Sequence, residues 1–309
     1  MPDYKNVRNI IITPAFGYDI DQVKIFLKSA EKSNIDARII LMRATKNKTF
    51  YKKILKYNSN AEIWVPPFVK FHEIGRKMLS RGPMISIWPY FIEKIRLITK
   101  KNSFIDLLLL PFCLQYVYAR HYYSYNFIVN NYDKINNIII TDVRDVVFQH
   151  DPFKYINDAL ITGAEPQRIK DSLWTTKNML RTTNDKNVLK LLDKQVLCAG
   201  VVGGKKNVVV EYLKVMITEI SNKFRKITMV QGDQGLHNYV LWAGKLNVPI
   251  QVSENGKGPI ATIGLCNERD ISSLNILSEN NPGNYSKPAI IHQYDRIMHF
   301  NDRIIKKYG

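Results

Sequence analysis

Two aspartates, Asp142 and Asp145, follow the aliphatic run Ile138-Ile139-Ile140-Thr141 and could share one task. A β-branched run of this kind predicts a buried strand, and ligands of open α/β sheets lie just outside the carboxyl ends of the strands. Two carboxylates three residues apart at such an end can reach one hard cation, which neutralises a diphosphate and makes it a good leaving group. In the alternative interpretation, Asp142 caps the strand and Asp145 pairs with Arg144 or another base. These residues alone do not choose between the two.

The elements that lead to this pair begin with a β-loop-α-β order, which favours a parallel sheet. Hydrophobic periodicity predicts strands over residues 9–13, 36–42 and 61–65, and an amphipathic helix over 21–32. A helix over 105–132, with a break near Pro111, leads into the strand that ends at Asp142. Residues 66–103 are rich in proline and aromatic residues, and we interpret them as an insertion or a mobile active-site flap.

The second half of the chain continues this pattern. Strands over 160–164 and 196–203 flank a polar segment, and helices follow over 207–224 and 233–243. A weaker strand over 248–252 contains Pro249, which confines it to a sheet edge or to the start of a strand. A short strand over 289–292 closes the series. Because the sequence shows no internal repeat and no low-complexity linker, we expect one α/β domain over residues 1–309.

The composition predicts a folded, cytoplasmic protein. Apolar residues make up 45% of the chain, which argues against disorder. The N-terminus lacks a signal-peptide pattern, and the longest apolar segment contains Asp106 and Pro111, so it cannot provide the roughly 20 apolar residues of a bilayer span. The three cysteines, Cys113, Cys198 and Cys266, are widely spaced, and we expect reduced thiols with no metal-finger framework.

The formal net charge of +18 points to a polyanionic partner, which could be a nucleic acid, an anionic membrane face or a phosphate-bearing substrate. A compositionally biased genome is the alternative explanation. No compact nucleic-acid-binding motif accompanies the basic residues, so we do not expect nucleic acid as the partner. For peripheral contact with an anionic membrane, the candidates are Lys94–Lys101, beside the aromatic run Trp88–Phe91, and Arg303–Lys307. Their alternative is a solvated surface.

Five segments, taken in order, resemble one family. They are Tyr118-Ala119-Arg120, Thr141–Phe148, Leu197–Gly204, Gln231–Gly235 and Ala289–His292. Together they resemble the nucleotide-diphospho-sugar transferases of the GT-A fold, particularly the glycogenin-like and the bacterial lipopolysaccharide galactosyltransferase-like enzymes. The resemblance covers most of the chain except residues 66–103. It implies a Rossmann-like α/β fold with a mixed, mostly parallel sheet flanked by helices.

The same resemblance implies a metal-dependent glycosyltransferase. The donor would be a nucleotide-sugar, with a UDP-sugar as the first expectation, and the acceptor a glycan, a lipid-linked glycan or a protein. Retention of the anomeric configuration follows from the resemblance only.

The metal ligands implied by the resemblance are Asp142, Asp145 and His292. The family pattern is usually Asp-x-Asp, whereas this chain has two residues between the aspartates. This departure leaves open which carboxylate binds the metal directly, and Asp142 could instead meet the ribose or Arg144. An imidazole beside two carboxylates suits Mn²⁺ better than Mg²⁺ or Ca²⁺, so we expect Mn²⁺, with Mg²⁺ as the alternative. A structural histidine at a strand end is the alternative for His292.

The donor contacts implied by the resemblance are spread along the chain. Arg120 and Arg296 would offset the phosphate charge, and the backbone at Gly200 would pass under the sugar, since small residues allow a close approach. Thr13 and Tyr18 lie where the family binds the nucleotide base and ribose. In the glycine strand Cys198 replaces the family's Asn, and we interpret it as a small buried hydrophobe because no His or Asp near it in the sequence forms an activating pair.

The catalytic residues implied by the resemblance are Asp233 and Gln234, whose side chains would reach the donor sugar or the acceptor. N-capping of a helix by Asp233 is the structural alternative. Two other functions stay open at this point. One is a nucleotide-sugar-binding protein of the same fold without turnover, because the metal motif is irregular. The other is a basic nucleic-acid-binding protein, whose binding would depend steeply on salt.

Overall fold

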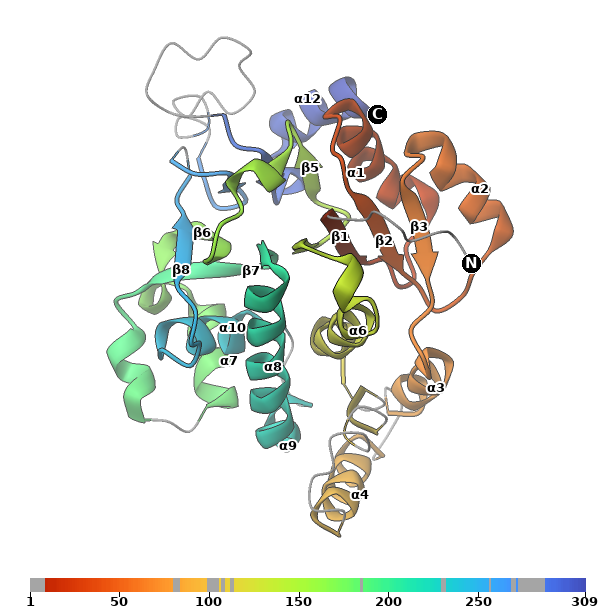
Figure 1. Cartoon of the computed structure of the whole chain (residues 1–309). Helices are drawn as coiled ribbons and strands as arrows, with labels where there is room; N and C mark the ends of the chain where they lie inside the picture. The colour runs from red at the N-terminus through yellow and green to blue at the C-terminus, as the bar shows by residue number, and fades with distance from the viewer. Residues whose placement is uncertain are drawn as a thin grey trace.

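A seven-stranded sheet forms the centre of the computed structural model, which describes residues 9–79, 84–98, 106, 109–111, 114–183, 186–228, 232–255, 257–267, 271 and 287–309. The strand order is β3-β2-β1-β4-β7-β6-β8 (Figure 1). The strands are β1 (Asn9–Pro14), β2 (Arg38–Met42), β3 (Ala61–Trp64), β4 (Asn137–Thr141), β6 (Leu160–Arg168), β7 (Gln195–Lys205) and β8 (Ile250–Ser253).

The sheet is mixed and mostly parallel, as the sequence predicts. Strands β3, β2, β1 and β4 pair in parallel, β7 runs antiparallel between β4 and β6, and β8 pairs with β6 in parallel. Strand β8 lies at the sheet edge and begins one residue after Pro249, where proline is tolerated. The α/β class and the strands predicted before residue 253 are therefore confirmed.

Helices cover both faces of the sheet because successive strand residues point to opposite sides. In β1, Ile11 packs into the core under α1 and α2, whereas Ile10 and Ile12 belong to the core on the other side. The helices of the first layer are α1 (Ile20–Lys32) and α2 (Lys48–Tyr57); those of the second are α6 (Tyr116–Asn130), α8 (Lys206–Asn222) and α10 (Gln234–Trp242). Each large aliphatic or aromatic side chain buried there contributes about 1.5–3 kcal/mol.

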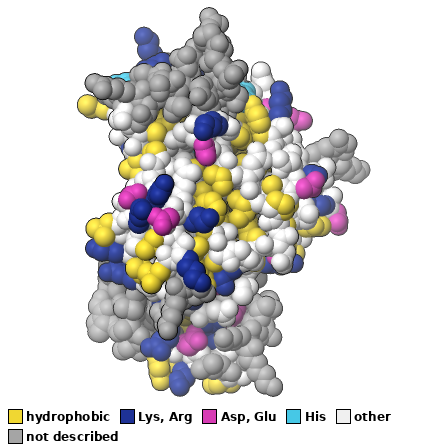
Figure 2. Space-filling model, turned by 90° about the vertical axis from the view of Figure 1, so that its left-hand side faces the viewer, with side chains coloured by type: hydrophobic (Ala, Val, Ile, Leu, Met, Phe, Trp, Pro, Cys, Tyr) yellow, Lys and Arg dark blue, Asp and Glu magenta, His cyan; other side chains and the backbone are white. Residues whose placement is uncertain are grey.

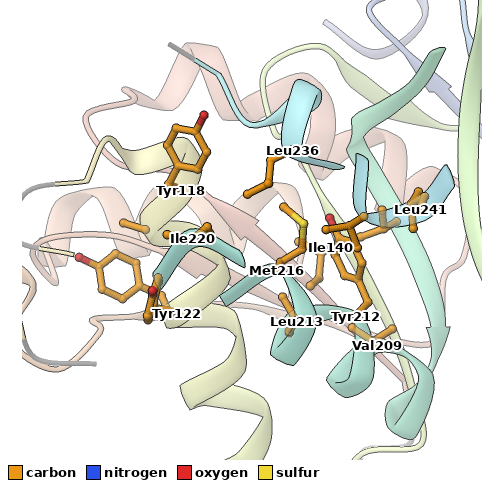
Figure 3. Close-up of a cluster of buried hydrophobic side chains, with 14 of the residues drawn as sticks. Tyr118, Tyr122, Ile140, Val209, Tyr212, Leu213, Met216, Ile220, Leu236 and Leu241 are labelled. Carbon is orange, nitrogen blue, oxygen red and sulfur yellow. The ribbon is translucent and has the colours of Figure 1, made fainter. Parts of the chain in front are cut away.

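The second core is the one from which α6 presents its functional side chains. Figure 3 shows Tyr118 and Tyr122 of α6 packed near Met216 and Ile220 of α8, with Leu236 of α10 alongside. Tyr118, Tyr122 and Tyr123 of this helix are buried in this core, whereas Tyr116 lines the cavity described below. Helix α6 begins at Tyr116, after the break predicted near Pro111, and the described residues 106 and 109–111 before that break are also helical.

A second, three-stranded sheet lies beside the first. Its strands are β5 (Val146–Phe148), β9 (Ile260–Thr262) and β10 (Ile290–His292), in the order β5-β10-β9, with the C-terminal helix α12 (Met298–Tyr308) nearby (Figure 1). The strand predicted over 289–292 therefore forms, but outside the main sheet. Strand β10 pairs antiparallel with β5, and His292 stands opposite Val146. This pairing brings His292 to the residues between β4 and β5.

The described part of residues 66–103 folds as two helices, α3 (Val69–Leu79) and α4 (Met84–Ile98), at one end of the molecule (Figure 1). Val69 and Ile92 are buried in the main core. Helix α2 was not predicted from the sequence. The polar segment after residue 165 contains α7 (Leu173–Thr182). A short helix, α9 (Phe224–Ile227), comes after α8.

Short 3-10 helices join several of these elements. They are η1 (Tyr132–Lys134), η2 (Pro152–Tyr155), η3 (Ile169–Asp171), η4 (Lys186–Leu191) and η5 (Tyr294–Arg296). Among the helices of the described residues, none combines the length and the apolar character needed to cross a bilayer.

Candidate functional site

Asp142, Asp145 and His292 form a cluster in which one ligand atom from each residue lies within 4.8 Å of the others. His292 Nε2 is 3.7 Å from Asp142 Oδ2 and 3.6 Å from Asp145 Oδ2. Asp142 directly follows β4, Asp145 directly precedes β5, and His292 ends β10. The three residues predicted as metal ligands therefore converge.

The cluster fits a divalent cation. His292 Nε2 is buried and has no hydrogen-bond partner among the described residues, so a good ligand atom points at two carboxylates without making a hydrogen bond to them. The gaps of 3.6 and 3.7 Å are too long for hydrogen bonds. They are shorter than the span of about 4.2 Å that two metal–ligand bonds of about 2.1 Å each can cover. The donor set of one imidazole and two carboxylates suits Mn²⁺.

The pKa values of the three ionisable groups in the cluster are shifted in different directions. Burial raises the pKa of Asp145 above its usual range. Burial also acts on Asp142, but Arg120 and His292 outweigh it and hold the pKa of that carboxyl below its usual range. Burial lowers the pKa of His292, but Cys198 and the two aspartates raise it by more. Asp145 is thus the carboxylate with the least charge compensation from the protein itself.

Arg120 is committed to protein carboxylates. Its Nη1 donates to Asp142 Oδ1 at 2.7 Å, its Nε and Nη2 donate to Asp233 Oδ2 at 3.2 and 2.8 Å, and Nη2 also donates to the Ala199 carbonyl at 2.8 Å. These four hydrogen bonds use four of the five N–H groups of a guanidinium. Arg120 lies at the site, as predicted, but has little donor capacity left for phosphate.

Asp233 is buried and is part of the same network. Its Oδ2 also accepts a hydrogen bond from His121 Nε2 at 2.9 Å. Burial raises the pKa of Asp233, but Arg120 and His121 outweigh it and lower this pKa to about 2. Asp233 precedes α10 and makes no side-chain cap hydrogen bond. The N-capping alternative is therefore wrong: an ion pair across the core, not the helix end, holds this carboxylate.

Gln234, the first residue of α10, faces a different polar group. Its Nε2 donates to Glu165 Oε1 and to Thr175 Oγ1, both at 3.2 Å. Glu165 is buried, and its other oxygen accepts a hydrogen bond from Gln167 at 2.9 Å. Asp233 and Gln234 are adjacent in sequence but point to different partners, so only Asp233 connects directly to the metal cluster through Arg120.

A cavity of about 300 Å³ opens beside the cluster. Its walls are formed by Pro14, Phe16, Tyr18, Tyr116, Val117, Arg120, Asp142, Val143, Arg144 and Asp145. Two of its aromatic lining residues, Phe16 and Tyr116, stack with their ring centroids 4.4 Å apart. The lining also includes the carboxylates of Asp142 and Asp145. Of the predicted nucleotide contacts, Tyr18 lines this cavity, whereas the Thr13 side chain is fully buried.

Two arginines occupy positions that the sequence analysis did not foresee. Arg144 lines the cavity, its side chain is 55% exposed, and its Nη2 lies 3.2 Å from Asp295 Oδ2. The alternative in which Asp145 pairs with Arg144 is therefore wrong. Arg296 is exposed on η5, where its side chain packs next to Gly264. The sequence signal that could have identified Arg144 as a site residue is its position between the two aspartates. Tyr116 also lines the cavity, but its helical periodicity was the only signal that it gave in the sequence.

Gly200 lies directly against the cluster. A Cβ atom at this position would be 2.5 Å from His292 Nε2 and 2.8 Å from Asp142 Oδ2. The Asp142 backbone N–H donates to the Gly200 carbonyl at 2.8 Å, so β7 and the end of β4 are held at this distance. Glycine is thus required here by its close approach to these two side chains, and the predicted contact of this backbone with a sugar stays a prediction.

We expect Gly200→Ala to weaken Mn²⁺ binding by about 10- to 100-fold, because the new methyl group would displace two ligands from their positions. Titration calorimetry with MnCl₂ measures this directly. Gly203→Ala, on the same strand, is the matched control: its Cβ would press on Ile139 and not on the cluster. A parent-like Mn²⁺ affinity in Gly200→Ala would contradict the proposed ligand set.

Cys198 lies next to a metal-ligand candidate, contrary to the expectation from sequence that no histidine is close. Its Sγ is 3.5 Å from His292 Nδ1, and the Gln293 amide approaches the same sulfur. Burial raises the pKa of the thiol, which keeps it protonated. The interpretation as a small buried residue is confirmed, and its contact supports the ring orientation of His292. Cys266 is also a free thiol, and Cys113 lies outside the described residues.

His237 makes stability sensitive to acid. It is fully buried, and its Nδ1 and the Tyr212 hydroxyl form a hydrogen bond of 2.9 Å. Burial lowers the pKa of His237 to about 3. The unfolded chain takes up this proton near pH 6.5, so the unfolded state binds more protons between pH 6.5 and about 3. The free energy of unfolding should therefore fall as pH decreases through this window, by up to about 1.4 kcal/mol per pH unit.

Urea unfolding at a series of pH values measures this slope. We expect His237→Gln to lose part of it, while His299→Gln, on the surface of α12, controls for the removal of an imidazole. If the slope is the same in His237→Gln and in the parent, another group is responsible for the acid sensitivity.

The site is built from segments that lie far apart in sequence, between β1 and β10. The cavity wall comes mostly from the loops after β1 and β4 and from the start of α6, the first aspartate directly follows β4 of the main sheet, and the small sheet contributes the histidine. A scan of the chain against protein-family models finds no match, and a search of curated proteins finds none either.

Proposed function

We propose that this chain is a metal-dependent glycosyltransferase of the GT-A fold. It would move a sugar from a nucleotide-sugar, with a UDP-sugar as the first choice, to a glycan, lipid-linked or protein acceptor. The observation that carries the proposal is the convergence of Asp142, Asp145 and His292 at the edge of a cavity of about 300 Å³. The position of this cluster, beyond the carboxyl end of a central strand, is where α/β sheets bind ligands.

The cavity suits a nucleoside diphosphate along its length. The stacked pair Phe16 and Tyr116 offers aromatic surface to a base. The cluster beside the cavity offers ligands for a cation, which would supply Lewis-acid compensation of the departing diphosphate when bound. The protein's own contribution is to hold Asp142 ionised through Arg120 and to keep His292 oriented against Cys198.

The side chains that would meet the sugar are Asp233 and Gln234. Arg120 joins Asp233 to Asp142, so the sugar side and the metal side of the site share one buried cation. The second oxygen of Asp233 takes no hydrogen bond from any described residue and is available to a hydroxyl group. Positioning of donor and acceptor by such groups is a large part of catalysis in group transfer.

Arg144 is the arginine that we assign to the diphosphate, in place of Arg120. It lines the cavity together with both aspartates, and among the described residues its one ion pair is with Asp295. Most of its N–H groups take no acceptor from the described part of the chain, whereas four of those on Arg120 are used. A guanidinium matches the geometry of phosphate oxygens and binds them through charge-assisted hydrogen bonds.

We expect Arg144→Gln to weaken UDP binding by about tenfold, since one hydrogen bond to a charged group is worth about 1.5–3 kcal/mol. Binding of uridine, which lacks the diphosphate, should not change. Arg296→Gln is the comparison variant, because Arg296 was predicted from sequence for the same role but is exposed on η5. Calorimetry with both ligands decides the matter, and a larger loss of UDP affinity in Arg296→Gln would reverse the assignment.

A screen of nucleotide-sugars with and without Mn²⁺ tests the proposed activity. We expect donor hydrolysis or transfer that needs the metal and stops when it is chelated. Donor binding with no hydrolysis or transfer for any donor would favour a non-catalytic nucleotide-sugar-binding protein. If no nucleotide-sugar binds in the presence of Mn²⁺, the proposal is wrong.

A further inference from the structure

The outer faces of α3 and α4 expose six large hydrophobic side chains. On α3, Phe71 and Ile74 are 45% and 56% exposed, and their spacing of three residues places them on one side of the helix; Phe68, just before α3, is 55% exposed. On α4, Tyr90, Phe91 and Ile98 are 50%, 53% and 80% exposed. We call these six residues, together with Lys70, Lys77 and Lys94, the α3–α4 surface. Exposed hydrophobic residues gathered in this way mark interaction sites.

The inner faces of both helices are firmly attached to the protein. His72 Nδ1 and the Tyr123 hydroxyl form a buried hydrogen bond of 2.7 Å between α3 and α6. Arg96 of α4 is fully buried, and its Nε donates to Asp106 Oδ1 at 2.7 Å. Because these contacts fix the rotation of each helix, the hydrophobic residues on the opposite sides are held toward the solvent.

The charge of this surface is basic. Its exposed lysines are Lys70, Lys77 and Lys94, and Lys94 Nζ lies over the Tyr90 ring at 5.4 Å. The two nearby acids are engaged with neighbours: Glu73 accepts a hydrogen bond from Tyr116 at 2.8 Å, and Glu93 pairs with Arg96. On the face over α7 and β8, by contrast, Lys and Arg side chains are scattered among acidic and other residues (Figure 2).

We propose that the α3–α4 surface docks the protein on an anionic lipid bilayer. Aromatic and aliphatic side chains on one helix face enter the interface between headgroups and acyl chains, and lysines beside them meet anionic headgroups. The net charge of +18 adds long-range attraction to the same partner. The proposal rests on this surface alone and holds whether or not the chain transfers a sugar.

The structure also selects between the two membrane contacts predicted from sequence. Helix α12, which carries Arg303–Lys307, lies at the opposite end of the molecule from α4 (Figure 1). A flat bilayer at one end does not reach the other, and α12 exposes two large hydrophobic side chains, Met298 and Ile305, whereas the α3–α4 surface exposes six. Helix α3 also reaches the cavity wall, since Glu73 bonds to Tyr116. The docked membrane would therefore lie on the side of the cavity that Tyr116 lines.

Vesicle co-sedimentation with the full chain tests the proposal. The probe is a vesicle of equal parts phosphatidylcholine and phosphatidylglycerol, compared with pure phosphatidylcholine, at low and at high salt. We expect binding to the anionic vesicles at low salt and a strong loss at high salt. Lys70→Gln and Lys94→Gln should each weaken the partition coefficient by about fivefold.

Phe71→Ser combined with Ile74→Ser should reduce the partition coefficient by roughly tenfold or more. Leu173→Ser combined with Leu189→Ser is the matched control, because these leucines are 67% and 64% exposed elsewhere on the surface. Far-UV circular dichroism and thermal unfolding confirm that each variant folds. Absence of binding to anionic vesicles at low salt, or equal losses in the two double variants, would overturn the proposal.

A second copy of the chain is the competing occupant of this surface. Sedimentation velocity without vesicles detects it. If the parent is a dimer and Phe71→Ser/Ile74→Ser is a monomer, the surface is a protein interface and the membrane proposal is wrong. A parent that is monomeric and binds anionic vesicles supports it.

Discussion

Asp145→Asn should abolish most of the metal-dependent affinity for UDP, with a loss of about 100-fold. The substitution keeps the shape of the side chain but removes one of the two negative charges that face His292 Nε2. Asp145 also has the least charge compensation within the protein, because burial raises its pKa while Arg120 serves Asp142. The cation is the partner that would restore its ionised form, so loss of the charge should weaken the cation directly.

Calorimetry with UDP, with Mn²⁺ and after chelation of the metal, measures this effect. Chelation should bring the parent to the affinity of Asp145→Asn. Asp158→Asn is the matched control, since Asp158 is highly exposed and, of the described residues, pairs with Lys205 alone. Equal metal-dependent UDP affinity in Asp145→Asn and in the parent would rule out this ligand.

Arg120→Met should lower the free energy of unfolding by about 3–5 kcal/mol, the range for breaking a buried ion pair by removing one partner. Without the guanidinium, Asp142 and Asp233 lose their shared cation, and Asp233 remains buried without it. The pKa of Asp233, about 2 in the parent, would rise when this cation is lost, so the stability that the ionised carboxylate contributes to the parent at neutral pH should be missing from the variant.

Urea unfolding at neutral pH gives the loss of stability. Arg168→Met is the control on an exposed arginine, whose Nη1 is 3.8 Å from Asp193, and we expect it to change stability by less than about 0.5 kcal/mol. Adding Asp233→Asn to Arg120→Met should recover part of the loss, because it removes the charge that was left buried. A loss below about 1 kcal/mol in Arg120→Met would mean that solvent, and not this arginine, stabilises the two carboxylates.

The sequence by itself determined the local structure of the sheet and the position of its reactive end. The run Ile10-Ile11-Ile12 supplies side chains to both faces of β1, and the same alternation in β4 requires helices on both sides. Asp142 follows β4 because the aliphatic run ends there. These features depend on neighbours in the chain, and their periodicity is visible in the sequence.

Tertiary structure alone decided which side chains share the site. His292 meets the aspartates, 147 and more residues earlier in the chain, only because β10 pairs with β5 in a second sheet that no local pattern announces. The same holds for Asp233, whose local pattern indicates a helix cap but whose partner is Arg120 of α6. It also holds for Arg120 and Arg144, since the number of donors left for a ligand depends on carboxylates from distant segments. Buried charges pair with the group that the fold brings within hydrogen-bond distance, because leaving them unpaired costs several kcal/mol. The distance between two such groups in the folded protein cannot be inferred from their separation in the sequence.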